Sequence, residues 1–486
     1  MIINTSEKMS KINKEIYGQF IEQVGRVIYD GIFVGKNSPI TNKNGIRLDI
    51  IEAFKEIGVP MLHWPGGGVA DSYHWRDGIG PQSERKPLIN HWDRTVEDNS
   101  FGTHEFFELC EEVGAEAYLV ANVGSATVRE TAEWIEYITF NGDTEMTRLR
   151  RQNGRENPWS LKFICMGNEW WIYENAEQYA GHYKRYNMFT RDYGPERMKR
   201  ILRGPHHFDY KMTDNLSRLV DQGTFDAMTL YQVIRPVRGG LPWYINSSSW
   251  DYPDDEYYMT MRNAVEIDES IARHIGILKR EDGNRNVKIA VDEWGTWYKD
   301  EAGGPIWYML STMRDALVQA AVLNIFNKHS DVLMLCNLGM TVNALSSLIL
   351  TSGEKMIKNP PFYVFKMYKE HQDSTLIYSY VDNETIEFDG IKLPCVSYSV
   401  SIKDGKMLIT LVNCMLDRDY NINCRILYEN YTKCEAEILH SDDVRMRNTF
   451  DNPDIIKPEE YKNFTVDGEN LQITLPRCSV MALRLS

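Results

Sequence analysis

The spacing of hydrophobic residues predicts alternating helices and short buried strands from about residue 50 onward. Residues 50–57 carry apolar side chains at helical spacing, Gly58 ends that helix, and residues 59–64 form a strand that runs into the turn 65–68. The alternation continues with helices predicted at 103–113, 128–140, 175–190, 213–220, 261–278 and 310–326, and strands at 117–123, 162–166, 200–202, 227–230, 288–291 and 332–335. About eight such units predict an α/β fold, a closed (β/α)8 TIM barrel.

The pattern changes after residue 375. Four segments there alternate between apolar and polar residues or are rich in strand-forming residues, with no helical period: 395–402, 407–413, 420–427 and 471–475. They predict a C-terminal antiparallel β-sandwich, and the first residues look like a short strand pair that joins it. We therefore expect N-terminal strands at 1–16, a catalytic barrel at 17–375 and a β-sandwich domain at 376–486, in broad contact because no flexible linker separates them.

Composition and charge narrow the class of protein. With 43% hydrophobic and 25% charged residues among 486, the chain is expected to fold, and disordered or collagen-like classes are excluded. Lys and Arg number 54 against 69 Asp and Glu, and 54 − 69 = −15, which disfavours nucleic acid and anionic membrane surfaces as partners. The N-terminus lacks the apolar core of a signal peptide, no run of about 20 apolar residues occurs, and the eight cysteines form no C-x-x-C pair. We expect a cytoplasmic protein with reduced core thiols.

Two glutamates follow predicted barrel strands. Glu169 comes after the strand at 162–166 and Glu293 after the strand at 288–291, and each is followed by tryptophan. Functional side chains of such barrels lie where strands end on the C-terminal face. A pair of carboxyl groups there is the equipment of glycoside hydrolysis, with one acid and one nucleophile or base. Either glutamate could instead be a helix-cap neighbour or a salt-bridge partner, and Asn168 could donate to a sugar hydroxyl or simply form a turn.

Other motifs point to no metal and no phosphate-bearing cofactor. Neither His206-His207 nor the segment 104–108 has the pair of histidines, four residues apart, that a zinc-binding helix uses. The glycines at 66–68 follow a strand but lack the Lys-Ser/Thr of a phosphate-binding loop, so they are interpreted as a tight turn beneath a pocket.

Several blocks of sequence resemble one enzyme family, and together they span essentially the whole chain. In order they are YGQFIEQVGR (17–26) with IYDGIFVG (28–35), WPGG (64–67) with YHWRDGIGP (73–81), NSFGTHEF (99–106), MGNEW (166–170), DEWGTWY (292–298) and NTFDNP (448–453). These blocks resemble glycoside hydrolase family 51, chiefly α-L-arabinofuranosidases.

The resemblance implies a (β/α)8 barrel with a β-sandwich and a retaining double displacement without a metal or organic cofactor. It implies that Glu169 is the general acid/base and Glu293 the nucleophile, and that sugar hydroxyls bind Asn168 and Glu22. Trp92 and Trp297 match positions that wall the entrance on the leaving-group side. Many members are intracellular and commonly hexameric, which implies a cytoplasmic homo-oligomer.

The chain departs from the family at the predicted sugar pocket. His63 stands where an arginine is usual, Gly68 replaces Asn or Cys, Tyr231 replaces a histidine, Val233 replaces an aromatic residue, and Met340 replaces a glutamine. Lost hydrogen-bond partners change discrimination between sugars, so a changed glycone is an open alternative. His63 either contacts the sugar or is a satisfied histidine beside Trp64, and Tyr231 either lines the sugar site or packs under a loop.

Three functions follow, in order of support. The first is a retaining, exo-acting α-L-arabinofuranosidase acting on oligosaccharides, and the second is the same chemistry on another pentose, furanose or hexose. The third, a non-catalytic carbohydrate binder, has no need of both Glu169 and Glu293. In the enzymatic mechanism Glu293 starts ionised and Glu169 protonated, its pKa raised by tryptophan neighbours and the nearby anion.

Overall fold

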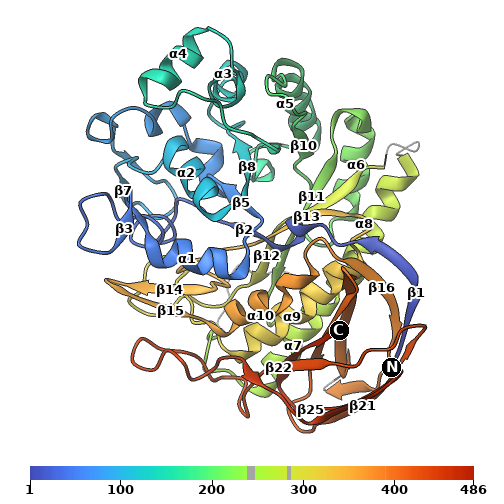
Figure 1. Ribbon diagram of the computed structural model, residues 1–486. Coiled ribbons are helices and arrows are strands. Elements are labelled where there is room, and N and C mark those ends of the chain that lie inside the picture. The colour runs from blue at the N-terminus through green and yellow to red at the C-terminus, as the bar shows by residue number, and fades with distance from the viewer. Residues whose placement is uncertain (238–246, 282–285, 389) are drawn as a thin grey trace.

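A closed barrel of eight parallel strands forms the larger part of the molecule (Figure 1). The computed structural model describes residues 1–237, 247–281, 286–388 and 390–486. Strand order around the barrel is β10-β11-β12-β13-β2-β5-β8-β9, which confirms the predicted (β/α)8 class. The strands are β2 Gly18–Phe20, β5 Met61–Trp64, β8 Glu116–Ala121, β9 Phe163–Met166, β10 Lys199–Leu202, β11 Ala227–Ile234, β12 Lys288–Thr296 and β13 Leu333–Leu338.

Helices surround the barrel, and all except α4 and α10, which the hydrophobic spacing did not predict, lie close to the expected positions. Gly58 and Gly114 end α1 and α2 with φ of 64° and 76°, left-handed values that favour glycine. The helices are α1 Leu48–Ile57, α2 Thr103–Val113, α3 Val128–Thr139, α4 Glu145–Gln152, α5 Ala176–Phe189, α6 Tyr210–Leu219, α7 Asp254–Val265, α8 Ile267–Glu281, α9 Met313–Lys328 and α10 Pro360–Tyr368.

The single helix predicted over 261–278 is wrong, because the chain breaks at Glu266 into α7 and α8. The two halves differ in their main packing partners: α7 lies against α9, whereas α8 lies mainly against α6 and touches α9 less.

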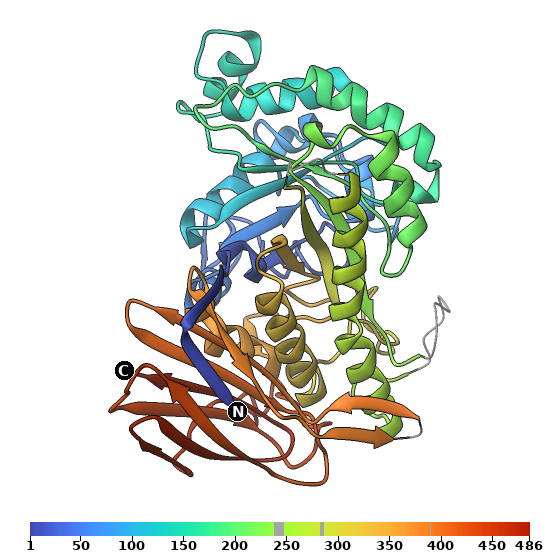
Figure 2. The same cartoon turned by 90° about the vertical axis from the view of Figure 1, so that its right-hand side faces the viewer.

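The C-terminal part is a ten-stranded sheet below the barrel (Figure 2). Its order is β23-β22-β26-β20-β19-β16-β1-β21-β25-β24, antiparallel except where β1 runs parallel to β21. Both halves of this sheet enclose one hydrophobic core, to which Ile3, Ile409, Ile473 and Leu483 belong. The strands are β1 Ile2–Lys11, β16 Thr375–Tyr380, β19 Val396–Lys403, β20 Lys406–Asn413, β21 Tyr420–Leu427, β22 Cys434–His440, β23 Glu459–Glu460, β24 Phe464–Asp467, β25 Asn470–Leu475 and β26 Ser479–Leu485.

The N-terminal segment corrects one expectation. It forms the single strand β1, antiparallel to β16 on one side and parallel to β21 on the other, and not a strand pair. Register shifts between Asn4 and Lys8 and between Lys8 and Lys11 bend the strand. β1 thereby connects the two halves of the sheet.

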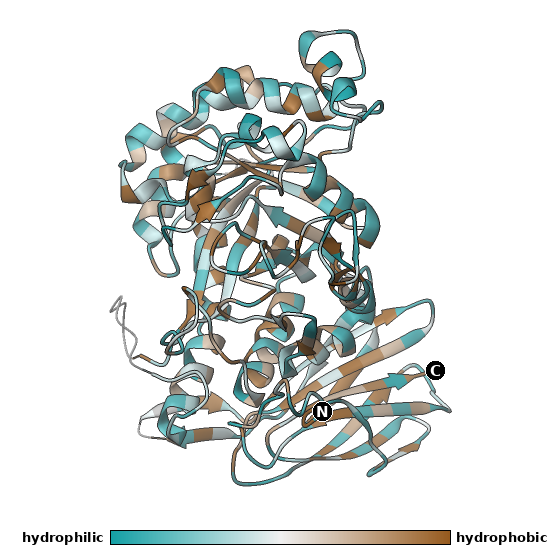
Figure 3. Ribbon diagram, turned by 90° about the vertical axis from the view of Figure 1, so that its left-hand side faces the viewer, coloured by the Kyte–Doolittle hydropathy of each residue, from teal (hydrophilic) through white to brown (hydrophobic). Residues whose placement is uncertain are grey.

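The interface between barrel and sheet is broad. α9 is apolar around most of its surface and lies against β19, β20 and β26, which is why nearly the whole helix is buried. Figure 3 shows brown, hydrophobic segments among teal, hydrophilic ones both in the barrel and in the C-terminal sheet. Asn324 and Asn327 of α9 donate to Ser397 and Ser399 of β19, each at 3.1 Å. We propose domain boundaries at residues 16 and 375, because β1 ends at Lys11 and β16 of the C-terminal sheet starts at Thr375.

Four two-stranded hairpins complete the described structure: β3 Asn42–Lys43 with β4 Ile46–Arg47, β6 Leu88–Ile89 with β7 Val96–Glu97, β14 Ile349–Ser352 with β15 Lys355–Lys358, and β17 Thr385–Phe388 with β18 Ile391–Pro394. All eight cysteines lie in the described ranges and none of them is in a disulfide. In those ranges no helix combines the length and hydrophobicity needed to cross a membrane.

Candidate active site

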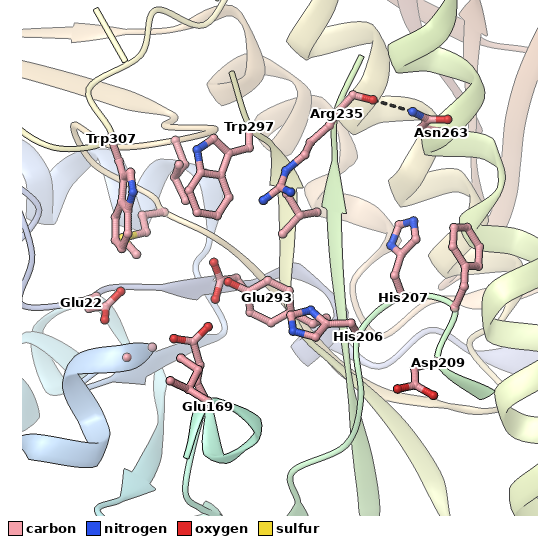
Figure 4. A pocket seen from close by; sticks show the side chains of 18 of the residues that line it. Glu22, Glu169, His206, His207, Asp209, Arg235, Asn263, Glu293, Trp297 and Trp307 are labelled. Carbon is pink, nitrogen blue, oxygen red and sulfur yellow. Dashed lines mark hydrogen bonds between the residues drawn. The ribbon is translucent and has the colours of Figure 1, made fainter. Parts of the chain in front are cut away.

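A cavity of about 800 Å³ opens at the C-terminal ends of the barrel strands. Three carboxyl groups, those of Glu22, Glu169 and Glu293, point toward one another at one end of it (Figure 4). They come from β2, β9 and β12, three strands that closure of the barrel brings to the same mouth. Other lining residues are Gly67, Gly68, Trp92, Ile172, His206, Tyr231, Val233, Arg235, Trp297, Trp307, Met340 and Leu345.

Glu169 stands on a sharp turn after β9. Gly167, with φ of 86°, allows the turn, and the backbone amide of Glu169 donates to Asp71 Oδ2 at 3.0 Å. The following residue, Trp170, stacks on Tyr179 of α5 with ring centroids 4.6 Å apart. Burial raises the pKa of Glu169 to about 7, against the lowering effect of the Arg203 charge.

Glu293 lies inside β12, which continues to Thr296 and does not end at residue 291 as predicted. The register with β11 shifts after the pair Leu230 and Val291, so that Tyr231 faces Glu293 and Asp292 has no opposite residue. Such a bulge re-aims side chains, and here Asp292 is buried inside the barrel while Glu293 lines the cavity.

Burial is the largest cause that raises the pKa of Glu293, to about 8, and the Glu169 charge adds to it. A hydrogen bond from the Tyr231 hydroxyl and the positive charge of Arg203 oppose the rise. Two carboxyl groups that repel in one cavity titrate as a pair, so they share a single proton over a range around neutral pH. The hydrogen bond from Tyr231 lowers the pKa of Glu293, but that pKa still lies above the pKa of Glu169, so the shared proton favours Glu293, the reverse of the expected starting state.

The Glu22 side chain packs against the main chain of Gly66 and Gly67. A Cβ on Gly66 would lie 2.3 Å from Glu22 Cγ, and one on Gly67 would lie 3.1 Å from Oε2, so the glycines make room for this carboxyl group. Its Oε1 accepts a hydrogen bond from the Val69 amide at 3.0 Å. Burial raises the pKa of Glu22 well above its usual range, and the charges of Glu293 and Glu169 add to the effect.

Two predicted sugar contacts do not line this cavity. His63 is fully buried beneath it, with its ring against Phe20 and Tyr118 and its Nε2 3.4 Å from Asp292 Oδ2. This position matches the alternative of an internal histidine, but it is not a satisfied one, because neither ring nitrogen has a hydrogen-bond partner among the described residues. Asn168 is also fully buried, next to Glu169, and neither polar atom of its amide has a hydrogen-bond partner among the described residues.

Three indole rings form a wall over the carboxyl groups. The Trp92 and Trp307 ring centroids are 6.4 Å apart, and those of Trp307 and Trp297 are 5.7 Å apart. A Cβ on Gly68 would lie 2.3 Å from Trp92 Cε2, so the absence of a side chain at position 68 lets this ring approach. Trp307 was not predicted, since it lies in a loop between β12 and α9 with no strand end nearby to mark it.

Four further site residues were missed: Asp71, Arg203, His206 and Arg235. Arg203 and Arg235 directly follow β10 and β11, so the strand-end rule used for the glutamates could have found them. The Arg235 guanidinium lies 4.8 Å from the Trp297 ring centroid. His206 packs against Trp171, with centroids 4.4 Å apart, and burial lowers its pKa to about 4. No pattern in the sequence marks Asp71, because the amides that it binds, those of Asn168 and Glu169, follow a different strand.

The remaining family departures lie at the cavity. Tyr231, Val233 and Met340 all line it, so Tyr231 is a lining residue and not merely packed under a loop. Among the residues that the structure describes, no group of three or more His, Cys, Asp or Glu side chains is arranged to hold a metal ion.

Comparison with known proteins gives consistent matches. The model of the α-L-arabinofuranosidase 1 domain matches residues 53–202, and that of the α-L-arabinofuranosidase C-terminal domain matches residues 292–479. An intracellular exo-α-L-arabinofuranosidase of Bacteroides ovatus is 40% identical over 484 residues, covering 98% of this chain and 93% of that protein.

Solved structures agree. A family 51 arabinofuranosidase from Xanthomonas axonopodis pv. citri superimposes with a TM-score of 0.96 at 32% identity, covering 100% of this chain and 99% of the other. An arabinose complex of the Thermotoga maritima α-L-arabinofuranosidase gives a TM-score of 0.85 at 27% identity, covering 99% and 98%.

Proposed function

Because this chain belongs to the α-L-arabinofuranosidases of glycoside hydrolase family 51, we propose that it releases terminal L-arabinofuranose from oligosaccharides by a retaining double displacement. The observation that carries the proposal is the convergence of Glu169 and Glu293, from β9 and β12, on one cavity. A carbohydrate binder has no use for two buried carboxyl groups with raised pKa values at that point.

In the first step the ionised Glu293 attacks the anomeric carbon. The bond from that carbon to the leaving oxygen breaks, and Glu169 gives its proton to this oxygen, so that the departing group leaves as an alcohol. The result is a glycosyl ester on Glu293. The ester removes a negative charge from the cavity, and the pKa of Glu169 then falls toward its ordinary range.

In the second step Glu169, now ionised, takes a proton from water, and the water oxygen attacks the anomeric carbon. The ester bond breaks, Glu293 recovers its charge, and the sugar leaves with its original anomeric configuration. Both steps use the same pair of groups. Glu169 gives a proton to the leaving group in the first step and takes another from water in the second.

We assign sugar hydroxyls to Glu22, which lines the cavity, and to Asn168, whose buried amide lies behind the lining next to Glu169 and would have to turn to reach a hydroxyl. We assign the leaving group to the wall of Trp92, Trp297 and Trp307. The unpartnered buried amide of Asn168 next to Glu169 supports a polar contact there, since a buried amide without a partner is costly. Flat apolar sugar faces stack well on indole rings.

We further propose that the protein acts in the cytoplasm and assembles as a homo-oligomer, a hexamer if it follows the resemblance. The name of the Bacteroides ovatus relative as intracellular supports the first part. Light scattering on the purified protein tests the second part: six times the chain mass supports a hexamer, and the mass of one chain contradicts any oligomer.

A panel of 4-nitrophenyl glycosides tests the function. We expect turnover of the α-L-arabinofuranoside well above that of xylosides, galactosides and glucosides. Preferred turnover of another glycoside would instead support the changed-glycone alternative, which the substitutions at Gly68, Tyr231, Val233 and Met340 keep open. Binding of arabinose without turnover of any substrate would contradict the enzyme assignment.

A further inference from the structure

Arg203 lies beneath the catalytic carboxyl groups, where it is almost completely buried. It is the first residue after β10, the strand between β9, which precedes Glu169, and β11, which pairs with the strand of Glu293. Its side chain does not line the cavity, so it reaches no substrate directly. Its contacts instead extend to the segments on both sides.

Toward Glu169, Arg203 contacts the turn and helix that follow β9, through its main chain in two hydrogen bonds and through its side chain at Trp171. The Trp170 indole donates to the Arg203 carbonyl at 3.3 Å, and the Arg203 amide donates to the Tyr179 hydroxyl at 2.9 Å. That hydroxyl donates in turn to the carbonyl of Met166, the last residue of β9, at 2.8 Å. The guanidinium lies 5.5 Å from the ring centroid of Trp171.

Toward Glu293, the contacts are with the residues that flank it in space. The guanidinium is paired with Asp292 through a buried hydrogen bond from Nη1 to Oδ2, and it lies 5.7 Å from the Tyr231 ring centroid. Tyr231 is the residue that faces Glu293 across the bulge. One side chain therefore contacts both neighbours of the nucleophile.

Asp292 accepts a hydrogen bond from only one nitrogen of the Arg203 guanidinium, Nη1. The Arg203 Nε and Nη2 have no hydrogen-bond partner in the described part of the chain, which leaves positive charge in a site with little water. His63 faces the same Asp292 oxygen, but burial lowers its pKa, so it contributes no charge near neutral pH.

We propose that Arg203 is a positioning residue for hydrolysis, which holds the two segments that carry Glu169 and Glu293 in one arrangement and supplies the positive charge beneath them. This inference rests on the proposed function. The charge stabilises the ionised form of the pair, and the contacts keep the acid and the nucleophile at a fixed separation.

Arg203 acts within a larger set of ionisable groups around the pair. They are Glu22 after β2, His63 on β5, Asp71 after β5, Tyr118 on β8, Cys165 on β9, His206 after β10, Tyr231 on β11, Arg235 after β11 and Asp292 on β12. The lowering effect of Arg203 is common to Glu169 and Glu293.

The test compares the Arg203→Met and Arg203→Lys variants of the full chain, with kcat and KM for 4-nitrophenyl α-L-arabinofuranoside measured across pH. For Arg203→Met we expect kcat to fall about 100-fold with a smaller change in KM, and both limbs of the pH profile to move up by about one unit. Arg203→Lys keeps the charge, so its limbs should stay near those of the wild type although kcat falls.

A matched control is Arg155→Met. Arg155 also lies over an indole, 4.9 Å from the Trp159 centroid, and pairs with a carboxylate, Glu111, but away from the cavity. Its profile should equal that of the wild type. Unmoved limbs in a folded Arg203→Met variant would overturn the proposal and leave Arg203 a purely structural residue.

If Arg203→Met does not fold, Arg203→Gln gives the decision, because its neutral amide can still donate to Asp292. Both limbs should then move to higher pH, while unmoved limbs overturn the proposal. Activity of the wild type on the arabinofuranoside is measured in the same series, so failure of the proposed function is seen separately.

Discussion

The backbone amide of Glu169 donates a hydrogen bond to Asp71 Oδ2 at 3.0 Å, and the preceding amide, that of Asn168, lies 3.3 Å from the same carboxyl group. Asp71 follows β5 and Glu169 follows β9, so this contact joins two strand ends and sets the direction of the acid/base side chain. Burial raises the pKa of Asp71 to about 6, opposed by these two backbone hydrogen bonds.

The Asp71→Ala variant should therefore turn over slowly. We expect kcat to fall by about 10- to 100-fold, because the turn that carries Glu169 loses two hydrogen bonds and its fixed geometry, while KM changes little. Steady-state kinetics measures both constants. Asp143→Ala, at an exposed position beside α4, should equal the wild type. An unchanged kcat in Asp71→Ala would show that the turn holds itself in place.

Replacing Glu169 by alanine should separate the two chemical steps. A nitrophenolate leaves without a proton, so the glycosyl ester on Glu293 still forms, but its hydrolysis loses the base. We expect a burst of nitrophenol, a steady rate lowered by about 100-fold or more, and restoration by azide, which attacks without a base and gives a retained glycosyl azide. Absence of both burst and azide rescue would count against the acid/base role. Glu354→Ala, in the exposed β14–β15 turn, is the control.

Replacing Glu293 should raise the thermal stability of the fold at alkaline pH and leave it nearly unchanged at acidic pH. The pKa of Glu293 is raised in the folded state to about 8, above its value of about 4.3 in an unfolded chain. The stabilising contribution of its protonated form is therefore complete below about pH 4 and is lost as the pH rises to about 8. Glu293→Gln should raise Tm at about pH 8.5 by several degrees and change it little at about pH 4. A Tm gain independent of pH would contradict this explanation.

A side chain at position 68 should disturb the indole wall. In Gly68→Ala the new Cβ would lie 2.3 Å from Trp92 Cε2, so the ring must move away from the carboxyl groups. We expect KM for arabino-oligosaccharides to rise by about 10-fold, with a smaller effect on the nitrophenyl substrate. Gly276→Ala in α8, where a Cβ meets nothing within 4 Å, is the matched control and should keep wild-type kinetics. Equal KM values in the two variants would show that Trp92 does not bind the leaving group.

Much of the fold could be predicted because its signals are local. α2 has the predicted bounds Thr103–Val113, since its apolar spacing is regular and Gly114 ends it. The break at Glu266 could not be predicted in the same way, because it depends on which helices α7 and α8 lie against. The single strand β1 likewise depends on partners more than 360 residues away along the chain.

The site residues that could be predicted also depend on local signals, and those that could not depend on distant partners. Glu169 was found because a strand end and a Gly-Asn turn are adjacent to it in the sequence. The bulge at Asp292 was not, since it exists only relative to the register of β11. For His63 the sequence left open a sugar contact or an internal histidine beside Trp64, and the geometry of β5 puts it beneath the cavity. The strand-end rule could have found Arg203, which directly follows β10, whereas Asp71 acts through contacts with another strand end, which no pattern within one segment reveals.

The assignment of Glu293 as the nucleophile can be tested by trapping the glycosyl ester with a 2-deoxy-2-fluoro-arabinofuranosyl substrate carrying a good leaving group. Digestion with trypsin should release the peptide of residues 289–299, and mass spectrometry should find the sugar attached to it. We predict that fragmentation places the sugar on Glu293 and that Glu293→Gln takes up no label. A sugar on Asp292 or on another peptide, or inactivation of Glu293→Gln at the wild-type rate, would contradict the account.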